Sequence, residues 1–257
     1  MSVHTVRFCL VVCLVLTCAT VCFSRKSSSS TAANCVAQAD ESWMGVYVIG
    51  KKVGDIHDVS AWHGKGSQAI YESREEMHMS LSLLGKEFGC DVITVSHFDS
   101  QHRPIYANET SISPDPTTGG KSRKVITARY GAKTVECETD VDGRVTKESV
   151  PIPPGVDLSA PDALDFENVP LVIGKSRKAT TFNLDQMAFV QTTSKITGRE
   201  KIKVNGRSYD SYTVSCQEAG AQCRIWISKN GGTIKLEIPV VGGYAVTETP
   251  AEAASGQ

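Results

Sequence analysis

The stretch that decides the fold is Trp43-Met-Gly-Val-Tyr-Val-Ile-Gly-Lys-Lys-Val-Gly54. A β-rich run ends at a turn over residues 49–52 and a second run returns from it, so the stretch predicts a β-hairpin. It contains no obvious catalytic group. It therefore marks the start of a folded domain that opens as antiparallel sheet.

The residues before this hairpin have the composition of an export signal. His4 and Arg7 form a weakly basic start. The uncharged run over residues 8–23 has about the length that a signal peptide needs, below the roughly 20 residues of a membrane span. We therefore expect residues 1–24 to be removed. The mature protein would then be extracytoplasmic, periplasmic or secreted, with no integral membrane span after signal cleavage.

The sequence leaves other fates of the N-terminus open. Small residues precede the expected cut after Ser24, and a cut after Ala33, within Thr31-Ala32-Ala33, is an alternative. An uncleaved membrane anchor is an alternative. Lipid attachment is another, although Cys18 and Cys22 lack the small preceding residue that a bacterial lipobox requires.

Charge and composition limit the partners and the domain organisation. The chain has 257 residues and a net charge of −1, and loss of residues 1–24 removes Arg7 and no acid, which gives −2. This near-neutral balance gives no reason to expect nucleic acid or an anionic membrane as a partner. Composition predicts a flexible linker over residues 25–40, a single β-rich domain over 41–246 and a disordered tail over 247–257.

Apolar residues recur at every second position along most of the domain. Met77, Met79, Leu81 and Leu83 alternate with polar neighbours, which is typical of a half-buried strand. Residues rich in Gly, Asn and Asp separate such runs and predict tight turns, including turns at 140–143, 197–198, 205–206 and 230–232.

The whole pattern predicts a mainly β fold: one large, strongly curved antiparallel sheet, like a half-barrel, with few short helices. A β-sandwich is the alternative architecture. One short helix is expected over residues 157–169, with Ser159 as its cap and Pro161 near its first turn.

Five cysteines follow the signal, so they cannot all pair within the chain. Cys216 and Cys223 flank a polar, glycine-containing turn between two strand-like runs. Hairpin pairing would bring them together, and a disulfide there would stabilise the fold by up to about 2–3 kcal/mol. Two reduced, packed thiols are the equally open alternative.

The common catalytic and metal-binding patterns are missing. The sequence has no G-x-S-x-G elbow, no P-loop and no C-x-x-C pair, so no cofactor or metal is expected. Cys90 leads into a β-run and precedes Asp91, which opposes a reactive thiolate. A hydrolase site around His57, Asp58 and His63, placed in a polar turn region, is the one catalytic alternative.

An apolar surface suggests ligand binding instead. Met77, Met79, Leu81 and Leu83 share one face of their strand, and methionine side chains adapt to varied apolar shapes. On the concave side of a curved sheet this face would line a lipid or acyl groove. Ordinary core packing is the competing interpretation.

Three segments resemble those of exported bacterial β-rich domains of unknown function. Residues 43–54 match the opening W-x-G-[IV]-Y-x-x-G-x-K-[IV]-G of domains that sometimes precede a transglutaminase-like domain. Residues 197–212 and 223–228 are similar to later segments of the same proteins. In outline such domains are similar to the half-barrel of lipoprotein-carrier proteins, where a curved sheet surrounds an apolar cavity.

One departure from these relatives bears on catalysis. A transglutaminase-like core needs a Cys followed by a His, and no histidine follows His102 in this chain. The resemblance therefore implies a stand-alone accessory domain. We expect a non-catalytic extracytoplasmic β-domain that binds an envelope protein or an apolar small molecule. A hydrolase and a purely structural envelope protein are the alternatives.

Overall fold

A computed structural model describes residues 39–83, 86–115, 118–160, 162–166, 169–218, 220–238 and 243–254. The predicted signal over residues 1–24 and nearly all of the predicted linker lie outside these ranges. The described residues form fourteen strands in one sheet, together with a 3-10 turn, η1 (Gly66–Gln68), and a short helix, α2 (Pro250–Ala254). The strands are β1 (Asp40–Val48), β2 (Lys51–His63), β3 (Ile70–Leu83), β4 (Lys86–Phe98), β5 (Pro104–Pro114), β6 (Lys121–Tyr130), β7 (Thr134–Val141), β8 (Arg144–Pro151), β9 (Ser176–Asn183), β10 (Ala188–Val204), β11 (Arg207–Glu218), β12 (Ala221–Ile227), β13 (Thr233–Ile238) and β14 (Gly243–Glu248).

The opening hairpin forms as the sequence predicts. β1 and β2 pair antiparallel, and Ile49 and Gly50 at the turn both have positive φ, at 50° and 74°. Two positive φ values suit the right-handed twist of a hairpin. β1 also pairs with β14, the last strand, so the opening hairpin lies in the middle of the sheet.

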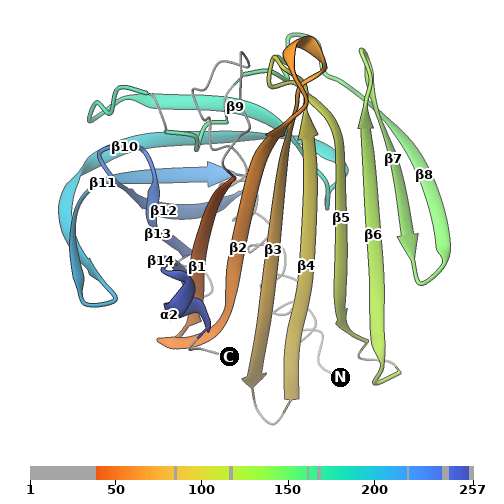
Figure 1. The fold of residues 1–257 in the computed structure, drawn as a ribbon. Helices are drawn as coiled ribbons and strands as arrows, with labels where there is room; N and C mark the ends of the chain where they lie inside the picture. Colours follow the sequence, from red (N-terminus) through yellow and green to blue (C-terminus); the bar gives the residue numbers. More distant parts are fainter. Residues whose placement is uncertain are drawn as a thin grey trace.

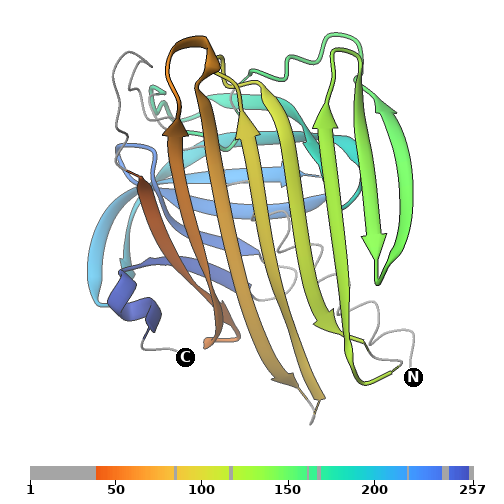
Figure 2. The same ribbon diagram turned by 45° about the vertical axis from the view of Figure 1, so that its right-hand side comes forward.

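The sheet is antiparallel throughout, and almost every strand pairs with its neighbours in the chain. Its order is β8-β7-β6-β5-β4-β3-β2-β1-β14-β13-β12-β11-β10-β9. Figures 1 and 2 show that β1–β8 stand side by side, while β9–β12 run across behind them. The predicted fold class, one large and strongly curved antiparallel sheet, is therefore confirmed.

Side chains hold the two ends of the curved sheet together. Phe182 of β9 and Phe189 of β10 share one hydrophobic cluster with Ala128 of β6 and Val135 of β7. The ring centroids of Phe182 and Phe189 lie 5.1 Å apart and the rings meet edge to face, which is a favourable aromatic geometry. The sheet therefore closes on itself through packing at this point.

The helix expected over residues 157–169 is wrong. The described part of this segment forms turns. Aspartate side chains accept hydrogen bonds from backbone amides there. Asp157 Oδ1 accepts the Ser159 amide, and Asp162 Oδ1 accepts the Leu164 amide, both two residues ahead. Such local bonds compete with helical ones. The segment packs Leu164 and Phe166 into a core cluster of β10–β13.

The turn expected at residues 197–198 is also wrong. β10 is one continuous strand, and the register with β11 shifts between Ile196 and Gly198. The glycine therefore marks a β-bulge, which lets a long strand bend without ending. The turns at residues 205–206 and 230–232 form as predicted.

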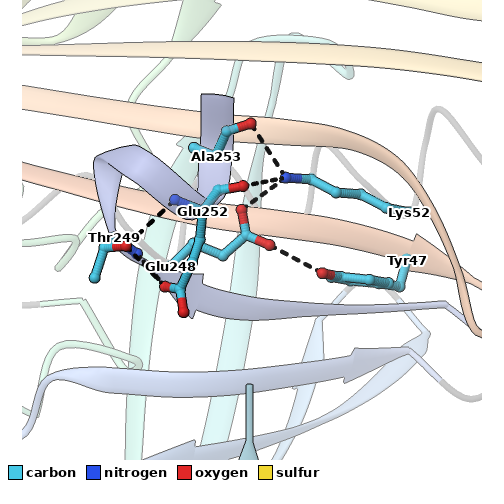
Figure 3. Close-up of polar contacts among 6 residues, drawn as sticks. All are labelled: Tyr47, Lys52, Glu248, Thr249, Glu252 and Ala253. Carbon is cyan, nitrogen blue, oxygen red and sulfur yellow. Dashed lines mark hydrogen bonds and ion pairs between the residues drawn. The ribbon is translucent and has the colours of Figure 1, made fainter. Parts of the chain in front are cut away.

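The tail expected to be disordered from residue 247 is ordered up to Ala254 (Figure 3). Thr249 and Glu252 form a reciprocal capping box at the start of α2, where the Thr249 amide and hydroxyl donate to Glu252 Oε2. Lys52 of β2 donates to the carbonyls of Glu252 and Ala253 and pairs with Glu248 at 2.8 Å. We call these contacts the C-terminal latch. Within the described ranges, no helix has the length and apolar character of a membrane span.

Candidate functional site: an acid-lined interior cavity

The apolar face proposed for ligand binding is placed largely in the core. Met77 and Met79 are only 3% and 8% exposed. They pack in one cluster with residues of β1, β2 and β4, and Leu81 lies against that cluster. The side chain of Leu83 lies outside the described part of the chain. An apolar ligand along this face stays a prediction.

The structure does not bring His57, Asp58 and His63 together. The polar turn in which we expected them is wrong, because all three lie on the continuous strand β2. His57 stacks on Trp43 with ring centroids 3.8 Å apart, and its Nε2 lies 2.8 Å from Glu41 Oε1. Asp58 points to the other sheet face, since side chains alternate along a strand. His63 is six residues from His57, about 20 Å along the strand.

Cys216 and Cys223 are directly opposite each other on β11 and β12 and are joined in a disulfide, with Cα atoms 5.1 Å apart. Cys90 and Cys137 are buried thiols. Burial, with Glu148 and Glu136 nearby, raises the pKa of the Cys137 thiol. A raised pKa makes this thiol less reactive. Among the described residues, no group of three or more His, Cys, Asp and Glu side chains is placed to hold a metal ion.

A different set of residues meets on the interior face of the sheet. Antiparallel register aligns one polar row across five neighbouring strands, and each residue in it is the direct partner of the next. Side chains that are direct partners lie within about 5.5 Å of each other at Cβ. The row runs Ser42, Asp58, Glu75, Thr94, Glu109.

The next interior row explains why space remains beside these acids. It consists of small side chains from β2 to β6, which fill little volume: Ser60, Ser73, Ser96, Ala107, Ala128. A cavity of about 140 Å³ lies here, between β3–β6 and the crossing strand β9. The residues that line it are Ser73, Glu75, Thr94, Ser96, Phe98, Pro104, Tyr106, Ala107, Glu109, Tyr130, Asp157, Leu158, Ala160, Asp162, Thr180, Thr181, Phe182, Asn183, Leu184 and Asp185.

Glu75 is the most deeply buried acid of the cavity, at 4% exposure. Burial first, and then the charge of Asp58 and a hydrogen bond to it, raise the pKa of Glu75 well above its ordinary value. Two carboxylates within hydrogen-bonding distance of each other repel, so ionisation of both is disfavoured. The folded protein therefore favours the protonated form of Glu75, hydrogen-bonded to Asp58.

Glu109 forms a second acid pair at the cavity wall. Burial, followed by the charge of Asp185, raises the pKa of Glu109 to about 7, and Lys124 opposes that rise. Lys124 Nζ lies 3.0 Å from Asp185 Oδ1. The cavity thus holds a carboxyl that changes its charge near neutral pH.

Several buried oxygens of the cavity have unused hydrogen-bonding capacity. The hydroxyls of Thr94 and Thr181 meet no partner among the described residues. Glu75 Oε2 has no hydrogen-bond partner in the described part of the chain either. Buried polar atoms usually have partners. The cavity therefore offers oxygens suited to a polar ligand group.

Sequence reasoning missed this site, although one signal for it was present. The alternation that places Met77 and Met79 on one face continues backwards to Glu75 and Ser73. An acid in line with buried methionines indicates a buried carboxyl. The partners from β4, β5 and β9 were beyond reach, because strand register and sheet closure bring them together.

Comparisons with known proteins relate this chain to proteins of unknown function. A family model described as "Protein of unknown function (DUF3108)" matches residues 95–244. Among solved structures, the chain is similar to a beta-barrel-like protein of domain of unknown function DUF1849 from Brucella abortus. That match has a TM-score of 0.45 and 10% identity, and covers 83% of this chain and 96% of the other. A comparison with curated protein sequences gave no match.

Proposed function

We propose, for this chain that belongs to the DUF3108 family of proteins of unknown function, a non-catalytic role in which the interior cavity binds a small ligand outside the cytoplasm. The signal-like composition of residues 1–24 supports the compartment. The cavity supports binding, because it combines an apolar wall with a few buried polar groups, as small-molecule sites do.

The observation that carries the proposal is the pair Glu75 and Asp58 beside a row of small residues. Burying carboxyl groups costs free energy, and an apolar core needs none of them. Elsewhere the same face of β3 packs Met77 and Met79 tightly. A fold that places acids, small side chains and unpaired hydroxyls in one spot suits a ligand better than it suits stability.

The size and lining of the cavity limit which apolar ligand, proposed from the sequence, could bind there. Phe98, Tyr130 and Phe182 give the cavity an aromatic wall, so an apolar part of a ligand fits there. A long acyl chain does not fit about 140 Å³, since a cavity of roughly 150 Å³ holds one benzene ring. An envelope partner and a purely structural role are competing outcomes of the test below.

The test is a fragment screen by ligand-observed NMR on the purified protein, with neutral, anionic and cationic one-ring compounds. Ala107→Leu and Ser96→Leu fill the cavity, while Thr110→Leu adds the same bulk on the other face of β5. We expect at least one class to bind the wild type and the Thr110→Leu variant and to lose binding in both filled variants. Equal binding to filled and unfilled cavities, or no binding by any class, would reject the proposal.

A second function, acid–base catalysis, is favoured by one observation. Burial and the neighbouring Asp58 raise the pKa of Glu75 well above its ordinary value, and a carboxyl with a raised pKa suits a general acid. Turnover of ester, peptide, phosphate or glycoside substrates that disappears in both Glu75→Gln and Asp58→Asn, and persists in Glu76→Gln, would establish it. A hydrolase site would therefore combine Asp58 with Glu75, and not with His57 and His63 as the sequence suggested.

A further inference from the structure

The geometry points to a small organic cation as the ligand: a primary ammonium group on an apolar body of about one ring. This inference rests on the proposed binding function and names the ligand class for the same cavity. Three properties of the cavity carry it: its charge, its unpaired oxygens and its aromatic wall.

The cavity is lined by acidic groups and by no basic side chain among its described lining residues. Five of the described lining residues are Asp or Glu, and none is Lys, Arg or His. Lys124 is the nearby cation, but it lies outside the lining and contacts Asp185. An anionic ligand would meet repulsion at short range in a poorly hydrated space, whereas a cation would be attracted. The charge therefore selects positive ligands.

The unpaired oxygens suit a donor-rich group. Thr94 and Thr181 each present a buried hydroxyl that has no partner among the described residues, and Glu75 lies directly opposite Thr94 in the strand register. A primary ammonium carries three N–H donors and no acceptor. Such a group has one donor for each of the two hydroxyls and one for the Glu75 carboxyl.

An ammonium would also replace the proton shared by Glu75 and Asp58. The proton leaves the carboxyl pair as the cation arrives, so the buried charge stays balanced. Binding by this route releases a proton to solvent and strengthens as pH rises. A neutral ligand releases none.

The aromatic wall fits the rest of the ligand. Phe98, Tyr130 and Phe182 line the same cavity, and the rings of Tyr130 and Phe182 meet edge to face with centroids 6.0 Å apart. Aromatic faces attract organic cations and pack against apolar rings. The volume of about 140 Å³ limits the buried part of the ligand to about one ring.

The experiment compares three one-ring probes by isothermal titration calorimetry: benzylammonium, benzyl alcohol and benzoate. We expect benzylammonium to bind at least tenfold more tightly than either of the others at pH 8. We also expect its binding to release protons, seen as a dependence of the heat on the ionisation enthalpy of the buffer.

Variants of one strand provide the matched control. Glu75→Gln keeps the shape of the protonated acid but cannot ionise, and should weaken benzylammonium at least tenfold and abolish proton release. Glu76→Gln changes the next residue, whose side chain is 45% exposed and faces away, and should leave both unchanged. Thr94→Val provides an independent variant if Glu75→Gln folds poorly, and should weaken the cation and spare benzyl alcohol.

The outcomes separate the ligand class from the binding function. Tighter binding of benzyl alcohol or benzoate, lost in Ala107→Leu, would overturn the cation and leave a binding cavity. Binding of benzylammonium that Glu75→Gln and Thr94→Val both leave unchanged would also overturn the assignment. Failure of all three probes, together with a negative fragment screen, would reject both inferences.

Discussion

Glu75 and Asp58 are direct partners on neighbouring strands, and a hydrogen bond joins their carboxyl groups inside the sheet. Because the pKa of Glu75 is raised in the folded protein, the folded state holds a proton that the unfolded chain releases near its ordinary pKa of 4.5. This contribution to stability is complete below that pH and is lost as pH rises through the raised pKa.

Replacing Glu75 should therefore change the pH dependence of unfolding. Glu75→Gln removes the titrating group and keeps a hydrogen-bonding amide, so we expect a flatter decline of the free energy of unfolding above pH 4.5. Urea unfolding from pH 4 to pH 9 measures this slope. Glu76→Gln should keep the wild-type slope. A Glu75→Gln slope equal to that of the wild type would show that Glu75 does not hold the proton.

The titration of Glu109 provides a second prediction. Its pKa is raised from 4.5 to about 7, so its contribution to stability is present below about pH 4.5 and is lost as pH rises to about 7. Asp185→Asn removes the neighbouring charge that raises this pKa and should lower it. Lys124→Met removes the opposing cation and should raise it. Carboxyl-detected NMR titration follows Glu109 directly, and shifts in the same direction for both variants would contradict the assignment.

The C-terminal latch depends on Glu248, whose side chain is 2% exposed (Figure 3). It accepts hydrogen bonds from Tyr47 and Lys52. Glu248→Ala leaves the partly buried Lys52 without its ion-pair partner, so we expect a loss of about 2–3 kcal/mol in the free energy of unfolding. Lys201→Met breaks an exposed pair with Asp210 and should cost less than about 0.5 kcal/mol.

Tyr47 reports on the same latch. Burial, then the hydrogen bond to Glu248 and its charge, raise the pKa of Tyr47 to about 12. In Glu248→Gln the charge is gone, so the pKa should fall toward 10. Ultraviolet titration of the wild type and of the variant measures the change, and an unmoved Tyr47 would contradict the contact.

Gly54, the last residue of the opening stretch, lies where the structure leaves no space for a side chain. A Cβ at this position would collide with the backbone carbonyl of His78 on β3. Gly54→Ala should therefore destabilise the protein by about 1–3 kcal/mol. Gly198→Ala is the matched control, since a Cβ there meets nothing within 4 Å. Thermal unfolding compares the two, and equal effects would show that backbone freedom, rather than space, decides at Gly54.

The sequence predicted several turns and hairpins correctly, but some local signals fitted two structures equally well. The opening hairpin and the turn at Asn205 follow from neighbours in the chain, because alternation and turn chemistry act over a few residues. The same reasoning failed for Gly198, where a bulge and a turn have the same local signal. It failed again for residues 157–169, where aspartate side chains bond to nearby amides instead of capping a helix.

By itself, then, the sequence determined that this chain forms antiparallel β structure and where several of its turns lie. Only the tertiary structure decided the candidate site. Asp58, Glu75, Thr94 and Glu109 are far apart in sequence, and hydrogen-bond register places them in one row. Curvature of the sheet then brings Phe182 over them and closes the cavity. The physical reason is that periodicity sets the face of each side chain, whereas register and closure set its neighbours.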